Sequence, residues 1–551
     1  MSLVIPTSSG ASPALRGPLR ARASRKVVCG LVLLLGFAPG SLISVTGTAS
    51  ASQPDVILKP SRESEAEGNA RHLHIAKRRA GPVVIVHRGA SAFAPENSLK
   101  AYAAAMDYGA DGCEVDLRRT RDGLLVLFHD DMLDRLTRSF GAVGQLSSRE
   151  LLALRPQRQF GRVLYGGAPT FAALLELACQ RAMLLHLDIK EPGLEDDIAR
   201  LLDDADAWDH VVAVNTYNAA RLLKHPKLKL LAYKGSGLYE QRRDMDLEAV
   251  QAQLARPGQM IMVDDPRVAA RVLRREPYLP VSLPESPPPT DGLTQPVTPP
   301  PVDAGAFSPA AHLAELATRV NPASVDQLLV LVEAGFPDAN QLAGDEAFQR
   351  RRTARIVERA WAAQRLGELG VKSARVVAAL ERLVRERSLH REWSYHGLDG
   401  AIASRALGWL DACESVPVLV EAFRRVDPEL KRVVSPELAQ YPLAWADFRA
   451  KMYILPALGE LPCASAKEFL RDYVTMGEVK ARELGPPLFE EATTALLCQR
   501  LEDSEIADLL RSPNPAVRGT AILECLDYPT EQRREALKAA APWAMELPQR
   551  K

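Results

Sequence analysis

The stretch that most constrains the fold of this chain lies between Val83 and Asp130 and contains three short apolar runs. They span Val83 to Val86, Cys113 to Leu117 and Leu124 to Phe128, and a helix-like segment from Ser98 to Tyr108 separates the first two. An apolar run, a helix and a second apolar run are typical of a strand–helix–strand unit in a parallel sheet. The sequence therefore predicts an α/β domain, with a TIM-type (β/α)8 barrel as the expected architecture.

Charged side chains accompany each of the three runs. His87 and Arg88 follow the first run, Glu114 and Asp116 lie in the second, and His129 follows the third. In a parallel barrel, side chains at the carboxyl ends of the strands converge on one mouth. We therefore expect two imidazoles, a guanidinium and at least two carboxylates to meet there.

Glu114 and Asp116 are two residues apart on a predicted strand, so both side chains point to the same face. Two like charges on an inward face are unfavourable unless a cation neutralises them. A hard divalent ion, Mg²⁺ or Ca²⁺, suits ligands that are all oxygen. A salt-bridged pair with arginines such as Arg118 is the alternative without a metal.

The order and spacing of four motifs resemble those of the glycerophosphodiester phosphodiesterase family. The motifs are HRG at residues 87–89, PEN at 95–97, GADGCEVD at 109–116 and DGLLVLFHD at 122–130. The resemblance covers about residues 81–266. It implies a TIM-type barrel and metal-dependent hydrolysis of a glycerophosphodiester to glycerol 3-phosphate and an alcohol.

The resemblance also implies roles for nine residues. His87 and His129 would divide acid and base catalysis, Arg88 and Lys190 would bind phosphate, Glu114, Asp116 and Asp188 would bind the metal, and Glu96 and Asn97 would support them. Which histidine is the acid and which the base stays open. Asp188 stands where the family usually has glutamate, so we expect altered metal affinity.

Two further residues near the motifs receive a structural interpretation. His186 lies two residues before Asp188 on the same predicted face and is interpreted as a core histidine. Asp264 resembles the aspartate that ends the last strand in the family, and we expect it to close off that strand.

Four later runs complete the set of predicted strands: 183–189, 211–214, 228–233 and 260–263. The total is seven, whereas a (β/α)8 barrel has eight strands. A tryptophan-containing strand that the family usually carries late in the barrel has no equivalent here. We therefore expect a barrel that is shortened or irregular on that side.

The chain divides into five segments. A basic region, an apolar run at 27–37 and a small-residue stretch ending at Ala51 predict a signal peptide over 1–51 and export to the periplasm or beyond, with an uncleaved N-terminal membrane anchor as the alternative. Residues 52–80 are expected to be a flexible lead-in and 81–276 the barrel. A proline-rich linker at 277–309 separates these from a helical domain at 310–551.

The segments beyond residue 309 carry helical periodicity that recurs at roughly forty residues, which favours HEAT-like repeats over a plain helical bundle. A surface of this kind often binds proteins, so a protein partner is expected. The formal net charge is zero, so nothing points to nucleic acid. The cysteines are scattered and predict neither a zinc cluster nor a disulfide framework.

Two alternatives to the hydrolase stay open. One is a phospholipase of the sphingomyelinase D type, which shares the paired histidines and the acidic metal site. The other is a non-catalytic protein that binds phosphodiesters or serves as a scaffold, favoured by the missing late strand and by the change at Asp188.

Overall fold

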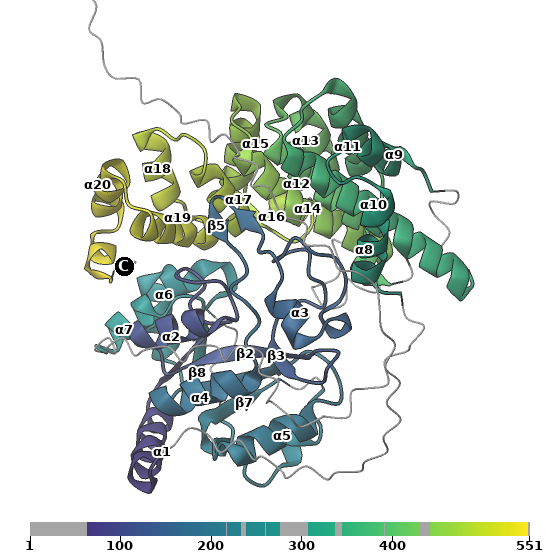
Figure 1. Cartoon of the computed structure of the whole chain (residues 1–551). Helices are drawn as coiled ribbons and strands as arrows, with labels where there is room; N and C mark the ends of the chain where they lie inside the picture. Colours follow the sequence, from purple (N-terminus) through teal and green to yellow (C-terminus); the bar gives the residue numbers. More distant parts are fainter. Residues whose placement is uncertain are drawn as a thin grey trace, which may run out of the picture. The chain divides into compact units, whose positions relative to one another are not determined.

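The computed structural model describes residues 63–215, 218–232, 238–258, 260–275, 307–336, 344–390, 392–428 and 441–548 (Figure 1). The predicted signal peptide, the first part of the lead-in and nearly all of the proline-rich linker lie outside the described residues. Residues 55–551 form one compact unit, so the sheet and the helices that follow it belong together.

A parallel sheet organises the first half of this unit. Its strands are β1 (Val83–Val86), β2 (Gly112–Arg119), β6 (Leu184–Ile189), β7 (Val211–Val214) and β8 (Met260–Val263). They run parallel in the order β7-β6-β2-β1-β8. The prediction of a parallel α/β sheet is confirmed, and among the described residues it is a half-barrel rather than a closed barrel of eight strands.

Two of the seven predicted strands differ from expectation. The third apolar run forms β3 (Leu125–Leu127), which pairs antiparallel with β2 because the chain reverses in a tight turn at Gly123, where φ is +86°. Residues 228–232 form no strand, and a hydrogen bond from Leu231 N to Val212 O at 2.9 Å is their contact with β7. The sixth predicted strand is therefore wrong over these residues, and Tyr233 lies outside the described part.

Short helices connect and flank the strands. They are α2 (Leu99–Asp107), α3 (Ser148–Leu152), α4 (Phe171–Arg181), α5 (Glu195–Asp204), α6 (Leu247–Leu254) and α7 (Arg267–Val272). Ser98, Ser147 and Thr170 each accept a backbone N–H at the start of a helix, as their sequence positions suggest. None of the described helices combines the length and apolar character that a membrane span requires.

The lead-in is not flexible throughout, because α1 (Glu65–Ala80) occupies its second half. Ser64 and Glu67 form a capping box at its start. This pair indicates the start of a helix, whereas the polar and charged composition of the segment suggested flexibility. Arg71 of α1 contacts His210 at 2.9 Å from Nη1 to Nε2, and His210 Nδ1 lies 2.7 Å from Met183 O. A neutral ring that donates from Nδ1 and accepts at Nε2 satisfies both contacts.

Acid is expected to weaken this contact. Burial, together with Arg71, lowers the pKa of His210 to about 4, whereas the unfolded chain binds that proton near pH 6.5. The unfolded state therefore holds the extra proton between these values, and the free energy of unfolding should fall by about 1.4 kcal/mol per pH unit as the pH drops. Denaturant unfolding between pH 7 and 4.5 measures this prediction. The free energy of unfolding of the His210→Gln protein should depend less steeply on pH than that of the wild-type protein. The exposed His74→Gln protein is the control, and equal slopes in the two variants would contradict the assignment.

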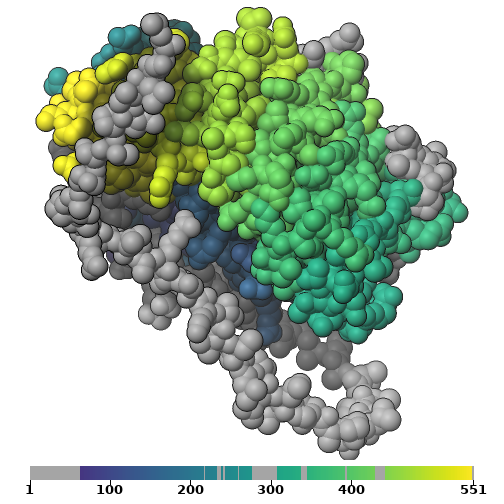
Figure 2. Space-filling view, turned by 90° about the horizontal axis from the view of Figure 1, so that it is seen from above, coloured from purple at the N-terminus to yellow at the C-terminus, as the bar shows by residue number. Residues whose placement is uncertain are grey.

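The second half is helical, as predicted. Its helices are α8 (Pro309–Arg319), α9 (Val325–Glu333), α10 (Glu346–Leu369), α11 (Ala374–Arg385), α12 (Leu398–Trp409), α13 (Val416–Arg424), α14 (Pro442–Glu460), α15 (Ala464–Thr475), α16 (Glu478–Arg482), α17 (Phe489–Leu497), α18 (Asp503–Leu510), α19 (Pro515–Asp527) and α20 (Glu531–Ala540). Helices α10, α12, α14, α17 and α19 contact one another in succession. In Figure 2 these helices, green to yellow, cover most of the visible face, and a strip of the sheet region shows in blue.

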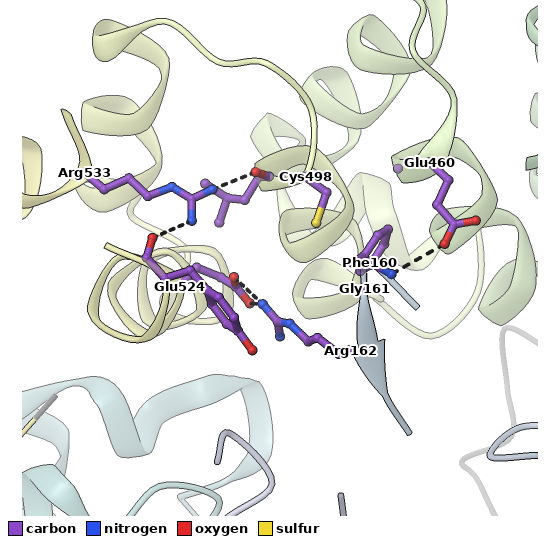
Figure 3. A pocket seen from close by; sticks show the side chains of 10 residues that line it. Phe160, Gly161, Arg162, Glu460, Cys498, Glu524 and Arg533 are labelled. Atoms are coloured by element: carbon purple, nitrogen blue, oxygen red, sulfur yellow. Dashed lines mark hydrogen bonds and ion pairs between the residues drawn. The ribbon is translucent and has the colours of Figure 1, made fainter. Parts of the chain in front are cut away.

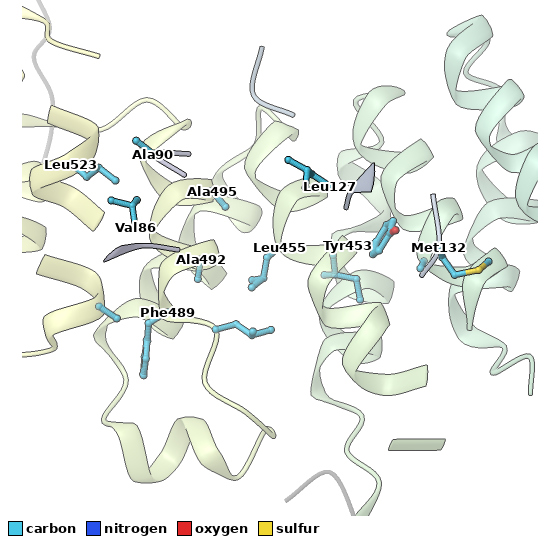
Figure 4. Close-up of a cluster of buried hydrophobic side chains, with 14 of the residues drawn as sticks. Val86, Ala90, Leu127, Met132, Tyr453, Leu455, Phe489, Ala492, Ala495 and Leu523 are labelled. Carbon is cyan, nitrogen blue, oxygen red and sulfur yellow. The ribbon is translucent and has the colours of Figure 1, made fainter. Parts of the chain in front are cut away.

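The two halves share a hydrophobic core. Val86 and Leu127 of the sheet region belong to the same buried cluster as Tyr453, Leu455 and Phe489 of the helices (Figure 4). Such continuity is unlike two domains joined only by a linker, which would each have a core of their own. The six cysteines that the structure describes are free thiols, as the absence of regular spacing predicted.

Polar contacts accompany this shared core. A hairpin formed by β4 (Arg158–Gln159) and β5 (Arg162–Val163) reaches the helices beside a pocket of about 520 Å³ (Figure 3). There Arg162 donates to both carboxylate oxygens of Glu524 at 2.5 and 2.6 Å, and its guanidinium lies over the Tyr528 ring at 4.1 Å. The pocket is thus lined by groups that already pair with one another.

Gly519 marks a close approach of α19 to the sheet region. A Cβ at this position of α19 would meet Arg242 O at 2.6 Å and Arg242 Cβ at 2.7 Å. We expect Gly519→Ala to reduce the free energy of unfolding by about 1–3 kcal/mol through overpacking. The control is Gly477→Ala, because a Cβ there meets nothing within 4 Å. Thermal unfolding measures both, and equal melting temperatures would contradict the packing argument.

Candidate active site

Strand register brings the predicted site residues to one edge of the sheet. Val86 of β1 pairs with Cys113 of β2 and with Val263 of β8, so the next residue, His87, lies between Glu114 and Asp264. On the other side, Asp116 pairs directly with Asp188 of β6.

Three carboxylates form the centre of this site. Glu114, Asp116 and Asp188 each present an oxygen, and these oxygens lie within 4.8 Å of one another. The Lys190 ammonium bridges two of them, at 2.8 Å from Asp116 Oδ1 and 2.6 Å from Asp188 Oδ2. Arg88 donates its backbone N–H to Glu114 Oε2 at 3.0 Å. The predicted acidic set is therefore assembled from two adjacent strands.

The protein treats the two β2 carboxylates differently. Burial, reinforced by the charge of Asp116, raises the pKa of Glu114. For Asp116 the cations Arg88, His129 and Lys190 outweigh burial and lower the pKa of the carboxyl. Asn97 holds Asp116 in place, because its Nδ2 donates to Asp116 Oδ2 at 2.7 Å. Asn97 thus contacts the acidic set directly, and its supporting role stays a prediction.

The donor set fits a hard divalent cation. The three side chains offer only oxygen, at mutual distances that one ion spans. The Lys190 ammonium and the Arg88 guanidinium lie beside these carboxylates, so two positive charges face three acidic groups. Arg118, the alternative partner, instead donates to His129 O at 2.8 and 3.0 Å. The arginine that pairs with the acidic set is therefore Arg88 and not Arg118, because Arg88 Nε lies 3.4 Å from Asp116 Oδ2.

His87 is held from two sides. Its Nδ1 lies 2.9 Å from Asp264 Oδ1, and its ring stacks on Tyr239 with centroids 4.5 Å apart. The predicted role of Asp264 was only to close off β8, and that interpretation is too narrow because Asp264 contacts His87 directly. Its position straight after β8, opposite His87 in the register, is the signal that the sequence contained.

His129 reaches the same site through the return strand β3. Phe128 N donates to Asp116 O at 3.1 Å, which places the following residue beside the acidic set. His129 Nδ1 lies 2.7 Å from Asp130 Oδ1. Burial and the nearby Arg88 lower the pKa of His129 against the opposing effect of Asp116 and Asp130. The antiparallel strand thus brings His129 to the site that a parallel strand was expected to reach.

Glu96 connects the two histidine regions. Its carboxylate accepts a hydrogen bond from each Nη atom of Arg135, at 2.7 and 2.8 Å, and its Oε1 lies 3.4 Å from Arg88 Nη1. These cations outweigh burial and lower the pKa of Glu96 to about 2. Arg135 also donates to Asp130 Oδ2 at 2.5 Å. The expected support of the site by Glu96 therefore runs through two arginines.

Several contributing residues were not predicted as members of the site. Asp130 partners His129, Arg135 ties Asp130 to Glu96, and Asn215 at the end of β7 donates to Asp188 Oδ1. Asp130 stands in the HD motif and Asn215 ends an apolar run, so a strand-end search would have found both. His186 lies half-buried beside Asp188, and burial lowers its pKa to about 4.

The strand ends of this parallel sheet gather two imidazoles, three carboxylates and two cations, which suit acid–base chemistry on an anionic substrate. The model of the glycerophosphoryl diester phosphodiesterase family matches residues 87–231. A glycerophosphodiester phosphodiesterase from Caldanaerobacter subterraneus subsp. tengcongensis is 33% identical over 167 residues, which cover 29% of this chain and 69% of the relative. The chain therefore belongs to the glycerophosphoryl diester phosphodiesterase family. It is an enzyme, and the alternative of a non-catalytic binding protein is not retained.

Two further similar proteins cover 16% and 35% of this chain. Human glycerophosphodiester phosphodiesterase 1 is 40% identical over 88 residues, 16% of this chain and 27% of the relative. The solved structure of an Oleispira antarctica phosphodiesterase in complex with sn-glycerol-3-phosphate is 23% identical, covers 35% of this chain and 90% of that chain, and has a TM-score of 0.26.

Proposed function

We propose that this enzyme hydrolyses a glycerophosphodiester to glycerol 3-phosphate and an alcohol, with His87 and His129 sharing the proton transfers. The observation that carries the proposal is that both imidazole rings are held in the same way, each by an aspartate at Nδ1. Each Nδ1 lies within 2.9 Å of a carboxylate oxygen, from Asp264 and Asp130 respectively. That contact leaves Nε2 as the ring nitrogen that exchanges a proton with the substrate.

The proton transfers follow from this arrangement. One imidazole takes the proton of the attacking hydroxyl as the new P–O bond forms. The other gives a proton to the leaving alkoxide as the old P–O bond breaks. A water gives glycerol 3-phosphate directly, whereas attack by the substrate's own glycerol hydroxyl gives a cyclic glycerol phosphate that a water must open in a second step, with the two imidazoles exchanging roles. Asp264 and Asp130 stabilise the imidazolium states, and Arg88 neutralises phosphate charge.

Glu114, Asp116 and Asp188 would hold a divalent cation, Mg²⁺ or Ca²⁺. When bound, such a cation supplies positive charge to the phosphate oxygens. Lys190 already bridges two of these carboxylates, at 2.8 and 2.6 Å. It would hold Asp116 and Asp188 together and offer its charge to the phosphate.

The test is an assay of the chain that starts at Ser52. Release of glycerol 3-phosphate is measured from glycerophosphocholine, glycerophosphoethanolamine and glycerophosphoglycerol, with Mg²⁺, Ca²⁺ or EDTA. Product that depends on metal supports the proposal and ranks the headgroups. Turnover of lysolipids with none of these diesters would instead favour the sphingomyelinase D type. No turnover of either class by folded protein would overturn the proposed substrate.

Finer features of the protein remain part of the proposal. We propose that α8 to α20 form a HEAT-like solenoid with a protein partner, since the helices of one layer contact one another in succession. We also propose that the sheet is a shortened TIM-type barrel and that the protein is exported. Cell fractionation with a C-terminal tag tests export, and recovery of the full chain in the cytoplasmic fraction alone would contradict it.

A further inference from the structure

Arg242 links the proposed catalytic histidine to the helical half. It lies in the 3₁₀ segment Glu240–Met245, which comes directly before α6. Its Nη1 is 3.0 Å from Asp264 Oδ2, and its Nε is 2.8 Å from Glu490 Oε2. Glu490 is in the first turn of α17. A continuous series of contacts therefore runs from Glu490 through Arg242 and Asp264 to His87.

The geometry of this series is closely determined. Asp264 uses one oxygen for His87 and the other for Arg242. Its backbone N–H donates to Asp244 Oδ2 at 2.8 Å, which holds the turn after β8. Arg242 has φ of +53°, an unusual conformation for an arginine, and its backbone packs against Gly519 of α19. The two middle members of the series are thus fixed, Asp264 by a backbone hydrogen bond and Arg242 by packing.

We infer that Glu490, a residue of the helical half, is a positioning residue for His87 that acts through Arg242 and Asp264. The inference rests on the proposed function, because it assigns Glu490 to the setting of a histidine proposed to transfer protons.

The physical reason lies in how one cation is shared. With Glu490 ionised, Arg242 divides its charge between two carboxylates, and Asp264 keeps enough negative charge to orient and stabilise the His87 imidazolium. Without that charge, Arg242 interacts with Asp264 alone and competes with His87 for it. The effect is on proton transfer, so kcat should change while KM does not.

The effect should depend on pH in a defined direction. Burial raises the pKa of Glu490 to about 8, assisted by the neighbouring carboxylates of Glu491, Asp264 and Asp244 and opposed by Arg242. Glu490 therefore gains its charge on going from neutral to alkaline pH. The kcat of the wild-type enzyme should therefore exceed that of a variant without this charge at pH 9.5 and equal it at pH 6.5.

Four variants test the inference in the full chain, with glycerophosphodiester turnover measured from pH 6.5 to 9.5. Glu490→Gln keeps the shape and removes the charge, and Glu490→Asp keeps the charge. Glu524→Gln is the matched control, because Glu524 also pairs with an arginine of the sheet region, Arg162, at 2.5 Å. His87→Ala establishes whether this histidine is used at all.

The expected result is a kcat for Glu490→Gln about tenfold below wild type at pH 9.5, with unchanged KM and a difference that closes toward pH 6.5. Glu490→Asp should recover part of the loss, and Glu524→Gln should follow wild type at every pH. An active His87→Ala enzyme would mean that the proposed function fails. An inactive His87→Ala enzyme with Glu490→Gln equal to wild type, or reduced equally with Glu524→Gln, would overturn only this inference.

Discussion

Replacing either histidine by alanine is expected to lower kcat for glycerophosphodiester hydrolysis by about 10²–10⁴. His87 and His129 each have Nδ1 fixed by a carboxylate, so the ring nitrogen available for proton transfer is Nε2 in both. Loss of one ring removes one of the two proton transfers. Release of glycerol 3-phosphate by the His87→Ala and His129→Ala proteins measures the effect.

The exposed His74 on α1 supplies the matched control, because its replacement removes an imidazole far from the sheet edge. His74→Ala should keep the wild-type kcat. A His129→Ala enzyme within threefold of wild type would contradict the proposed role of His129 and leave His87 to act with another group.

The second large effect is expected at Asp116. This side chain is fully buried, accepts Asn97 Nδ2 at 2.7 Å and contacts Lys190 Nζ at 2.8 Å. Asp116→Asn keeps the shape but removes a charged oxygen ligand and leaves Lys190 with less negative charge to pair with. We expect divalent metal affinity to fall about 10–100-fold and turnover to be lost at low metal concentration.

Isothermal titration with Mg²⁺ and with Ca²⁺ measures this prediction, with circular dichroism to verify the fold. Asp203→Asn is the control, because Asp203 is a solvent-exposed carboxylate on α5 that pairs with Lys227 at 2.5 Å. If Asp116→Asn binds both ions as tightly as the Asp203→Asn protein does, Asp116 is not a ligand.

The sequence predicted which side chains lie together better than it predicted the directions of the strands. The catalytic and acidic candidates lie at ends of apolar runs, and period-two alternation alone places Glu114 and Asp116 on one face. Strand direction also had a local signal, in the length of the connection: residues 120–124 join β2 to β3, and a parallel pair needs a crossover of about a dozen residues or more. β3 is apolar like its neighbours, and only the turn at Gly123 reverses it, so the expectation of a third parallel strand was wrong.

Contacts between residues far apart in the sequence could not be predicted from local patterns. Asp264 follows β8 and contacts His87, 177 residues earlier, because β8 pairs with β1. That pairing is set by how the sheet assembles, so the sequence showed a strand end and not its neighbour. The contact of Arg242 with Glu490 is more distant still, and no spacing rule relates a 3₁₀ segment to the first turn of a later helix.

Helix α19 of the helical half packs against the 3₁₀ segment Glu240–Met245 of the sheet region, and this has a consequence for how such a protein can change over generations. Gly519 leaves room only for the backbone of Arg242, and Glu490 pairs with the same arginine. A substitution on one side is then tolerated only with a matching substitution on the other. The sheet and the helices would be inherited as one unit, and an exchange of either half between relatives would break the active site even when both halves fold.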